Sequence, residues 1–434
     1  MNERNTLKIN NKNHLEIGGV DALNLVADFG TPLYVFDVAH IENMCNAYTD
    51  ALNQYYGDGM ISYASKAFSC KAIYRLIKDL NLGADVVSGG ELYTALKSDF
   101  PMEKLIFHGN NKSDSELKMA IDNGVGYIVI DSYSEADRLN NILSNQSKIQ
   151  NVLIRVNPGV EAHTHHFIQT ATEDSKFGFS ISNGDAKAFI EHVLTLKNLN
   201  LLGLHCHIGS QIFESKSFVL AVKKMTSFYK EIKDSLGKEF DVINMGGGFG
   251  IWYSEGDKML KYDDYKDFVR VISDSLINSV KEKSLKKPFL ILEPGRSIVG
   301  EAGITLYTAG SVKEIKNVKN YVAIDGGMFD NPRFALYQAR YSLALAEKMD
   351  LKPEKLYSIA GKCCESGDKI AEDVMLPEVK EGDILAVFST GAYNYSMASN
   401  YNRNLIPPVV FVKDGKAEYV VKPQTFDDII RNDL

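Results

Sequence analysis

The chain has 434 residues, 45% hydrophobic and 24% charged, so it is long enough to bury a large core and to form two domains. Its formal net charge of -8, without a long basic run, excludes a nucleic-acid or anionic-membrane partner, because such partners need clustered Lys and Arg. The polar start MNERNTLKINNKNHLEI lacks the apolar segment of a secretory signal, and no apolar run is long enough for a transmembrane helix. We therefore expect a soluble, cytoplasmic protein.

The cysteines agree with a reducing compartment. They are odd in number and show no paired framework, so we expect no structural disulfide. They stand at Cys45, Cys70, Cys206, Cys363 and Cys364.

Short apolar runs separated by amphipathic segments predict eight β-strands. We expect them at 61–64, 84–87, 105–107, 127–130, 152–156, 201–205, 242–245 and 289–292. Between them, apolar residues recur every three to four positions and predict helices, among them 70–80, 90–99, 114–124, 186–196, 218–236 and 263–283. Alternating strands and helices predict parallel strands, and eight such units in roughly 250 residues indicate a TIM-like (β/α)8 barrel. The alternative is an open, doubly wound sheet.

After about Glu301 the strands become short and follow one another without long helices, except for a helical pattern near 335–346. The runs YVAID, KLYSIAG, DILAVFST, PPVVFVKDG and KAEYVV predict an antiparallel β domain. The N-terminal runs LEIGG and TPLYVFD also look strand-like and are candidates to pair with it. The predicted fold is therefore α/β plus all-β, with a barrel at 37–300 and a β domain at 301–434 together with 1–36.

Catalytic groups in such barrels gather where the strands end, at the carboxyl-terminal face. Lys66, in YASKAF, follows the first barrel strand, and a lysine delivered there into a closed pocket can lose its proton and form Schiff bases. The alternative is an ordinary surface lysine. Further polar residues follow other strands: His108, Asn110, Asn157, His205, His207, Gly209 and Ser210. We expect only one of His205 and His207 to face the barrel mouth.

The last two predicted strands run into glycine-rich turns. In MGGGFG, Gly246 to Gly248 expose backbone amides that suit a phosphate, although a tight turn would also use glycines. In EPGR, Glu293 is placed to face into the barrel, and Gly295 and Arg296 can bind an anion. Alternatively, Glu293 and Arg296 pair with each other.

An amine nucleophile, a phosphate nest, an imidazole that can stack on a ring and a carboxylate that can keep a ring nitrogen protonated are together what pyridoxal 5'-phosphate (PLP) requires. With these motifs in this order, the chain resembles the diaminopimelate decarboxylase family of the alanine-racemase-like, fold type III PLP enzymes. The resemblance runs from PLYVFD to the final β domain. It implies that Lys66 binds the cofactor as a Schiff base, that His207 stacks on its ring and that Glu293 contacts the pyridine nitrogen. The implied phosphate-binding set is Ser210, Gly247, Gly248, Gly295, Arg296 and Tyr393.

The resemblance also implies the substrate-binding residues, namely Arg296, Arg333, Tyr337, Glu365 and Tyr393. Cys364 resembles the proton donor, with Lys66 as the other candidate acid. The implied reaction converts meso-2,6-diaminopimelate to L-lysine and carbon dioxide, the last step of lysine biosynthesis by the diaminopimelate route. An arginine fork binds a distal carboxylate and a glutamate binds an ammonium, a pattern that suits this substrate and suits ornithine or lysine poorly. In the family the CESGD segment reaches the site of a second subunit, which implies a homodimer with shared active sites.

Three other functions remain open. A related decarboxylase of arginine, ornithine or carboxynorspermidine shares the barrel but should lack the pairing of Arg333 with Glu365. A racemase of the same fold uses a tyrosine on the β domain as its second base, and Tyr393 keeps this reading open. A PLP-binding homeostasis protein is a single barrel, and the β domain counts against it.

We predict no metal site. The neighbours Cys363 and Cys364 could indicate redox or metal chemistry, but there is no CxxC and no matching histidine spacing. The cluster of His163, His165 and His166 could also be interpreted as a metal site, although histidines in a long loop near an active-site rim are commonly solvated.

Overall fold

The computed structural model describes residues 6–160 and 176–434, and the chain divides into two compact units. The barrel unit comprises Met44–Gly250 and Leu260–Gly295, and the sheet unit comprises Met1–Asn43, Ile251–Met259 and Arg296–Leu434. The predicted domains, a barrel at 37–300 and a β domain at 301–434 with 1–36, remain a proposal. They differ from this division, for example in placing Ile251–Met259 in the barrel. The predicted cluster of His163, His165 and His166 lies outside the described residues. Among the helices that are described, none is both long and apolar enough to cross a lipid bilayer.

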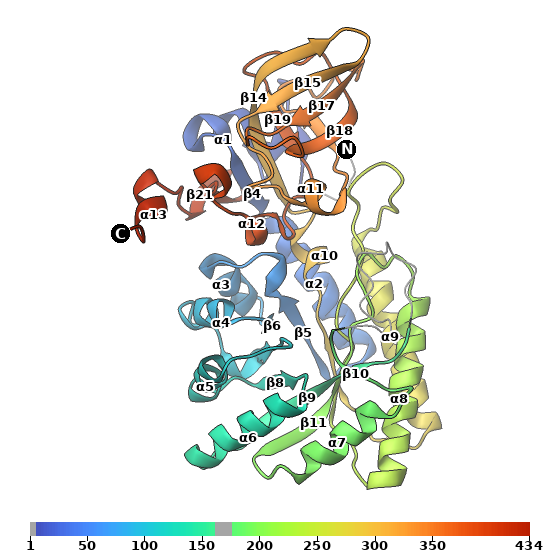
Figure 1. The fold of residues 1–434 in the computed structure, drawn as a ribbon. Coiled ribbons are helices and arrows are strands. Elements are labelled where there is room, and N and C mark those ends of the chain that lie inside the picture. The colour runs from blue at the N-terminus through green and yellow to red at the C-terminus, as the bar shows by residue number, and fades with distance from the viewer. Residues whose placement is uncertain (1–5, 161–175) are drawn as a thin grey trace. The chain divides into compact units, whose positions relative to one another are not determined.

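The barrel unit is a closed ring of eight parallel strands (Figure 1). Each strand pairs with the next, and the ring closes where Leu290 of the last strand pairs with Gly59 of the first. This closure confirms the barrel over the open sheet, and all eight strands lie where the sequence predicts them. They are β5 (Gly59–Ala64), β6 (Gly83–Val86), β7 (Leu105–Phe107), β8 (Tyr127–Ile130), β9 (Gln150–Asn157), β11 (Leu199–His205), β12 (Val242–Asn244) and β13 (Phe289–Leu292), with the short β10 (Phe179–Ser180) attached to β9.

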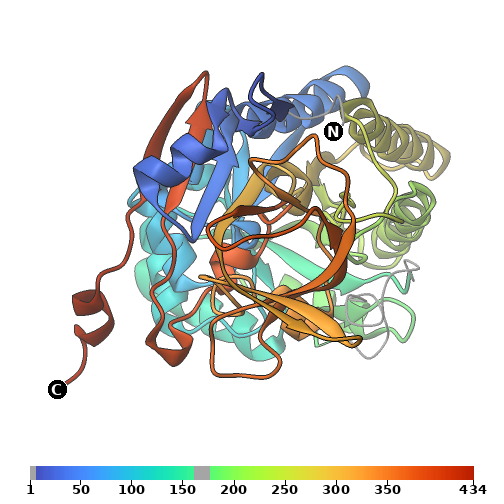
Figure 2. The same cartoon turned by 90° about the horizontal axis from the view of Figure 1, so that it is seen from above.

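Barrel strands are covered on both faces, which explains why they read as short, nearly continuous apolar runs. Inside the ring, Ile106, Val129, Leu153, Val242 and Ile291 form an apolar cluster to which five strands contribute. Around the outside lie α3 (Lys71–Asp79), α4 (Gly89–Leu96), α5 (Asp114–Asp122), α6 (Tyr133–Gln146), α7 (Asp185–Thr195), α8 (Lys216–Leu236) and α9 (Tyr262–Glu282), which Figure 2 shows as an outer ring. The long α2 (Val38–Tyr55) precedes β5.

Serine side chains fix the starts of three barrel helices, and so the lengths of the loops that follow the strands. Ser88, Ser113 and Ser132 each accept a hydrogen bond from the backbone N–H three residues on. These caps satisfy amides that would otherwise lack partners in the first turn. The loops after β6, β7 and β8 are therefore short and have defined ends on the helix side.

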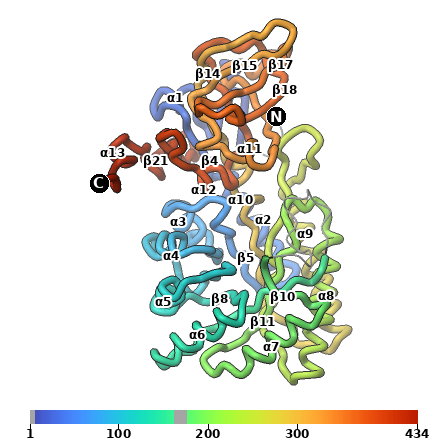
Figure 3. The backbone as a smooth tube through the Cα atoms, viewed as in Figure 1, coloured from blue at the N-terminus to red at the C-terminus, as the bar shows by residue number. Residues whose placement is uncertain are grey.

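The sheet unit is built around the long strand β14 (Gly303–Ile315), which pairs antiparallel with β4 (Leu33–Asp37), β15 (Lys319–Ile324) and β19 (Ile384–Val387). Its other strands are β16 (Leu343–Leu345), β17 (Lys355–Ala360), β18 (Lys369–Leu376), β20 (Val409–Lys413) and β21 (Lys416–Val421). Strand β4 lies between β14 and β20, so Phe36 pairs with both Gly303 and Phe411. Figure 3 traces this juxtaposition of the N-terminal strand with strands from the end of the chain.

At the N-terminus, β1 (Lys8–Ile9), β2 (Leu15–Ile17) and β3 (Val20–Asp21) form a small sheet before α1 (Ala22–Phe29). Leu15, Ile17 and Leu25 from this segment pack with Val35 and Val410 in one apolar cluster. The expected pairing of the N-terminal segment with the β domain is thus confirmed.

Two expectations for the sheet unit need correction. The sheet is not wholly antiparallel, because β15 pairs parallel with β17 and β4 pairs parallel with β20. Neither pair is joined by a hairpin, so chain connectivity does not impose antiparallel pairing on them. The helical pattern near 335–346 was wrong in extent: α11 spans only Arg333–Tyr337, Gln338 ends it in a left-handed conformation with φ 55°, and the next apolar residues form β16.

Candidate active site

Lys66 stands at the carboxyl-terminal end of β5, as the sequence predicts. It lies in a single 3-10 turn, Ser65–Ala67. The turn is held by Glu91, whose Oε2 accepts hydrogen bonds from Ser65 Oγ at 3.2 Å and from Val87 N at 2.8 Å. The expectation of a closed pocket is not met in the single chain, because the Lys66 side chain is exposed. An exposed amine at a strand end is accessible to an incoming aldehyde.

Glu293, directly after β13, is the centre of a buried polar cluster inside the barrel. Its Oε1 accepts hydrogen bonds from His108 Nε2 at 2.8 Å and from Asn244 Nδ2 at 2.6 Å, and its Oε2 lies 3.2 Å from His205 Nε2. Burial alone would raise the pKa of Glu293, but His108 and His205 outweigh it and hold this pKa well below its usual range. The ends of β7, β11, β12 and β13 thus converge on one ionised carboxylate.

The two rings of His108 and His205 meet edge to face, with centroids 4.7 Å apart. Together with Glu293 they offer ligand-type atoms within 4.8 Å of one another, the kind of arrangement that can hold a metal ion. A histidine bound to metal normally donates its other ring N–H to an acceptor, yet His205 Nδ1 is buried without a partner among the described residues. The arrangement therefore favours a neutral His205 ring that donates to Glu293 through Nε2.

His207 follows β11 and lies beside the glycine turn, where its Nδ1 accepts a hydrogen bond from Gly247 N at 3.3 Å. Loss of water and the positive charge of Lys66 lower the pKa of His207 well below its usual value, so the ring is neutral. Which of His205 and His207 faces the barrel mouth stays a prediction. Residues two positions apart lie on the same side of a strand, so alternation does not separate the two rings, and the electrostatic field of Glu293 acts on both.

The glycines of three turns allow the backbone to pack closely around the strand ends. A Cβ at Gly247 would lie 2.0 Å from the carbonyl oxygen of Glu293, and one at Gly248 would lie 2.3 Å from that of Gly209. At Gly295 it would meet Ala64 at 2.7 Å. Ser210 lies in the same turn as Gly209. Larger residues would push these turns apart, which identifies a cradle that only glycine permits.

Asp85 is a site residue that the sequence analysis missed. It is the last residue but one of β6 and is 4% exposed. Burial and the negative charge of Glu293 raise the pKa of Asp85 well above its usual value, while the positive charge of Lys66 opposes this shift. Asp85 could have been recognised from the sequence as a carboxylate within the otherwise apolar segment GADVV.

The sheet unit contains a second polar cluster, formed by two buried arginines and three tyrosines. Arg296 begins α10 (Arg296–Val299) and Arg333 begins α11, and each side chain is only 8% exposed. Arg296 donates to the hydroxyl of Tyr253 at 2.5 Å, and Arg333 donates to that of Tyr341 at 2.7 Å. The predicted residues Arg296, Arg333 and Tyr393 are thus brought together, whereas Tyr253 and Tyr341 were missed. Tyr253 belongs to no motif, and Tyr341 ends the loop MFDNPRFALYQARY, in which only Arg333 and Tyr337 were singled out.

Tyr393 places its ring over Arg296, with the guanidinium carbon 4.7 Å from the ring centroid. Its backbone adopts φ 72°, a left-handed conformation that is uncommon for a residue with a bulky side chain. Backbone strain of this kind is typically found where a side chain is aimed for a function.

The predicted residues Tyr337, Cys364 and Glu365 are exposed on the sheet unit. The turn that carries Cys364 and Glu365 is anchored by Asp368, whose carboxylate accepts hydrogen bonds from Met328 N at 2.6 Å and Cys363 N at 2.7 Å. Burial and Asp368 raise the pKa of the Cys363 thiol to about 12. Of the two neighbouring cysteines, only Cys364 is therefore presented to solvent as a usable thiol.

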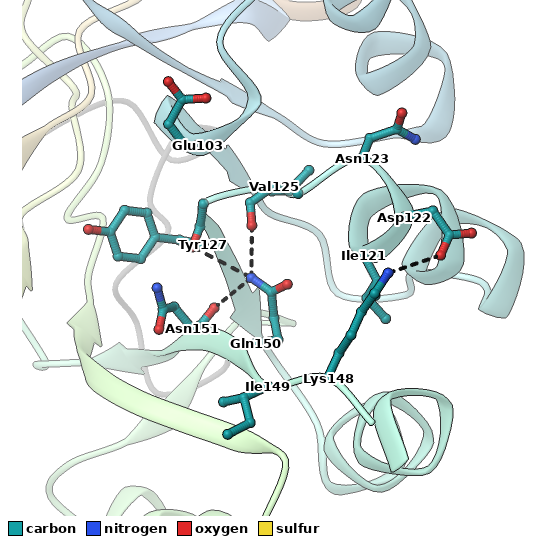
Figure 4. A pocket seen from close by; sticks show the side chains of 12 residues that line it. Glu103, Ile121, Asp122, Asn123, Val125, Tyr127, Lys148, Ile149, Gln150 and Asn151 are labelled. Atoms are coloured by element: carbon teal, nitrogen blue, oxygen red, sulfur yellow. Dashed lines mark hydrogen bonds and ion pairs between the residues drawn. The ribbon is translucent and has the colours of Figure 1, made fainter. Parts of the chain in front are cut away.

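A pocket of about 640 Å³ lies at the other end of the barrel, near the starts of β8 and β9 (Figure 4). Gln150 crosses it and donates to the carbonyl oxygens of Val125 and Asn151. The predicted site residues do not line it, so we assign it no part in the chemistry.

The neutral state of His205 predicts a pH dependence of stability. Burial lowers the pKa of His205 to about 4, whereas an unfolded histidine takes up its proton near pH 6.5. Between pH 6.5 and 4 the unfolded chain binds a proton at this histidine and the folded chain does not. The free energy of unfolding therefore decreases as the pH falls toward 4, by up to about 3 kcal/mol from His205. His205→Gln should flatten the decline in urea unfolding midpoints between pH 7 and 4. His192→Gln, on α7, serves as the control, and an equal slope in both variants would contradict the assignment.

The chain is similar to known proteins over nearly its full length. The family model "Pyridoxal-dependent decarboxylase, pyridoxal binding domain" matches residues 38–300. The diaminopimelate decarboxylase of Bacillus subtilis is 50% identical over 433 residues, which cover 99% of this chain and 97% of that protein. The protein of the same name from Halalkalibacterium halodurans is 48% identical over 430 residues, covering 99% and 97%. The crystal structure of diaminopimelate decarboxylase from M. jannaschii with L-lysine aligns with a TM-score of 0.91 at 36% identity, covering 100% of this chain and 99% of that one.

Proposed function

The chain belongs to the diaminopimelate decarboxylases of the pyridoxal-dependent decarboxylase family, and we propose that it converts meso-2,6-diaminopimelate to L-lysine and carbon dioxide. This is the last step of lysine biosynthesis by the diaminopimelate route. The enzyme is a carboxy-lyase that uses PLP, and we place it in the cytoplasm.

The barrel unit fits PLP on its own geometry. It offers the Lys66 amine at one strand end, a glycine cradle at Gly247 and Gly248, and a buried ionised carboxylate at Glu293. When bound, the cofactor supplies an acceptor for the electrons that remain on the substrate Cα after carbon dioxide leaves. We assign its binding to Lys66, His207, Ser210, Gly247, Gly248, Glu293, Gly295, Arg296 and Tyr393.

Within the barrel each residue has a distinct task. Glu293, kept ionised by His108 and His205, would hold a proton on the ring nitrogen of the cofactor. His207 is neutral and therefore presents an uncharged face for stacking. Lys66 would anchor the cofactor and can move a proton at the substrate Cα. The other proton donor is Cys364, which belongs to the sheet unit.

The observation that carries the choice of substrate is the pair of buried arginines. Arg333 is 8% exposed, and within the described residues no carboxylate forms an ion pair with it. A buried cation that meets only phenols lacks a counter-charge, and an anionic ligand can supply one. We assign the distal carboxylate of the substrate to Arg296 and Arg333, and its distal ammonium to Glu365, with Tyr337 and Tyr393 completing the set.

The primary test measures carbon dioxide release from meso-2,6-diaminopimelate by the purified enzyme with PLP, with lysine, ornithine and arginine run in parallel. Release from meso-2,6-diaminopimelate alone, with an equal amount of L-lysine formed, is the expected result. Release only from another amino acid would replace the proposed substrate by that of a sister decarboxylase. No release with PLP bound would favour a racemase.

We further propose that the enzyme is a homodimer in which the exposed Cys364 and Glu365 complete the site of the partner. Equal mixing of Lys66→Ala and Cys364→Ala protomers should then restore about a quarter of the normal activity, because half of the dimers are hybrids and each hybrid has one intact site. Activity after subunit exchange is the measurement. Mixing Lys66→Ala with a Lys66→Ala, Cys364→Ala double variant is the control and should restore none. No recovery in the first mixture, after exchange has been verified, would contradict shared sites.

A further inference from the structure

The segment Ile251–Met259 leaves the barrel unit after β12 and belongs to the sheet unit. Its backbone is fixed at two points, because Ser389 Oγ donates to the carbonyl oxygen of Trp252 and Ser342 N donates to that of Tyr253, both at 2.9 Å. Within the segment, Asp257 Oδ2 accepts hydrogen bonds from Tyr253 N at 3.1 Å and Ser254 N at 3.2 Å. Tyr253 is therefore held in a defined position.

Tyr253 contacts both buried arginines. Its hydroxyl accepts a hydrogen bond from Arg296 Nη1 at 2.5 Å, and its ring centroid lies 4.9 Å from the guanidinium carbon of Arg333. Its ring also meets that of Tyr341 edge to face, with centroids 5.5 Å apart and an interplanar angle of 82°. Tyr341 in turn accepts a hydrogen bond from Arg333 Nη1 at 2.7 Å, and Asn394 Nδ2 donates to the Tyr341 hydroxyl at 3.2 Å.

Two guanidinium groups repel each other, and burial strengthens this repulsion. A carboxylate would neutralise a guanidinium, whereas phenol oxygens and ring faces can hold it without doing so. Each of the hydrogen bonds described uses one of the five N–H donors of its guanidinium. Tyr253 thus fixes the two arginines in orientation and leaves the positive charge of Arg333 available for an anion.

We propose that Tyr253, together with Tyr341, is a positioning residue that gives the enzyme its preference for ligands with a distal carboxylate. The inference rests on the proposed function, because it takes Arg296 and Arg333 as the groups that bind this carboxylate. It extends the binding site to the segment Ile251–Met259, which carries none of the residues assigned above.

The test uses Tyr253→Phe in the PLP-loaded enzyme, because phenylalanine keeps the ring and removes only the hydroxyl. We expect KM for meso-2,6-diaminopimelate to rise about tenfold, as for loss of a hydrogen bond to a charged group. We expect kcat to stay within about twofold, since the change affects binding at the distal end. The absorbance spectrum of the bound cofactor should be unchanged.

The inhibition constants of two ligands can distinguish binding of the distal carboxylate from binding of the rest of the molecule. L-lysine keeps this carboxylate, while 1,5-diaminopentane has the same chain and lacks it. In Tyr253→Phe the inhibition constant of L-lysine should rise about tenfold, and that of 1,5-diaminopentane should not change. Tyr341→Phe should likewise raise the ratio of the L-lysine inhibition constant to that of 1,5-diaminopentane.

Tyr357→Phe is the matched control. Tyr357 is buried in the same apolar cluster, but its hydroxyl accepts a hydrogen bond from Val379 N rather than from an arginine. This variant should lower stability without changing the ratio of the two inhibition constants. An unchanged ratio in Tyr253→Phe, in an enzyme that decarboxylates meso-2,6-diaminopimelate normally, would overturn the inference alone. Failure of the unaltered enzyme to decarboxylate this substrate would overturn the proposed function and the inference with it.

Discussion

Replacing Lys66 by alanine should remove the visible absorbance of lysine-bound PLP and lower the rate of carbon dioxide release by roughly 10⁴-fold, the upper end of what one proton-transferring group contributes. Lys66 is the amine that the 3-10 turn Ser65–Ala67 presents at the end of β5. Alanine has no group that can bond to the cofactor aldehyde, and it can move no proton. Absorbance spectra and carbon dioxide release on the same preparations measure the two effects.

Lys71→Ala is the control for this experiment. Lys71 is the first residue of α3, five positions further on, and its side chain is also exposed. The Lys71 variant should keep both the absorbance band and the activity. A Lys66→Ala enzyme that retained the band would show that another lysine binds the cofactor.

Replacing Arg333 by alanine should raise KM for meso-2,6-diaminopimelate by about a hundredfold or more, as expected when one member of a buried charged contact is lost. Arg333 is buried, contacts the rings of Tyr253 and Tyr341 and donates a hydrogen bond to the Tyr341 hydroxyl. The affinity for PLP should change far less than the affinity for the substrate. Steady-state kinetics and a PLP titration of the same variant measure the two quantities.

Arg333→Lys tests whether the charge alone is sufficient. A lysine keeps the positive charge but lacks the planar fork that binds a carboxylate through two donors, so most of the rise in KM should remain. Arg403→Ala, at an exposed site, controls for the loss of an arginine elsewhere in the sheet unit. Equal losses of PLP and substrate affinity in Arg333→Ala would mean that Arg333 does not belong to the distal end of the substrate.

The barrel was predictable because each of its strands and helices can be recognised from the pattern of neighbouring residues. Strands covered on both faces read as apolar runs, and polar residues such as Lys66, His207 and Glu293 interrupt them where the strands end. The order of strands and helices then fixes the parallel ring. Alternation could not distinguish His205 from His207, because residues two positions apart lie on the same side of a strand.

Contacts between distant segments were not predictable. Asn244 and His108 bind Glu293 across 49 and 185 residues of sequence, and no spacing rule connects them. Tyr253 contacts the arginines of the sheet unit, although the chain before and after its segment Ile251–Met259 belongs to the barrel unit. The apolar pattern after Arg333 suited a helix, but the left-handed Gln338 divides it into a short helix and a strand.

The central position of β4 in the sheet unit has a consequence for the newly made chain. This strand is buried throughout and pairs with β14 and β20, both of which emerge from the ribosome only after the whole barrel has been translated. At about 5–20 residues per second, the wait lasts on the order of tens of seconds. During that time LYVFD is an apolar segment with two unpaired edges, a target for chaperones and a site of premature association.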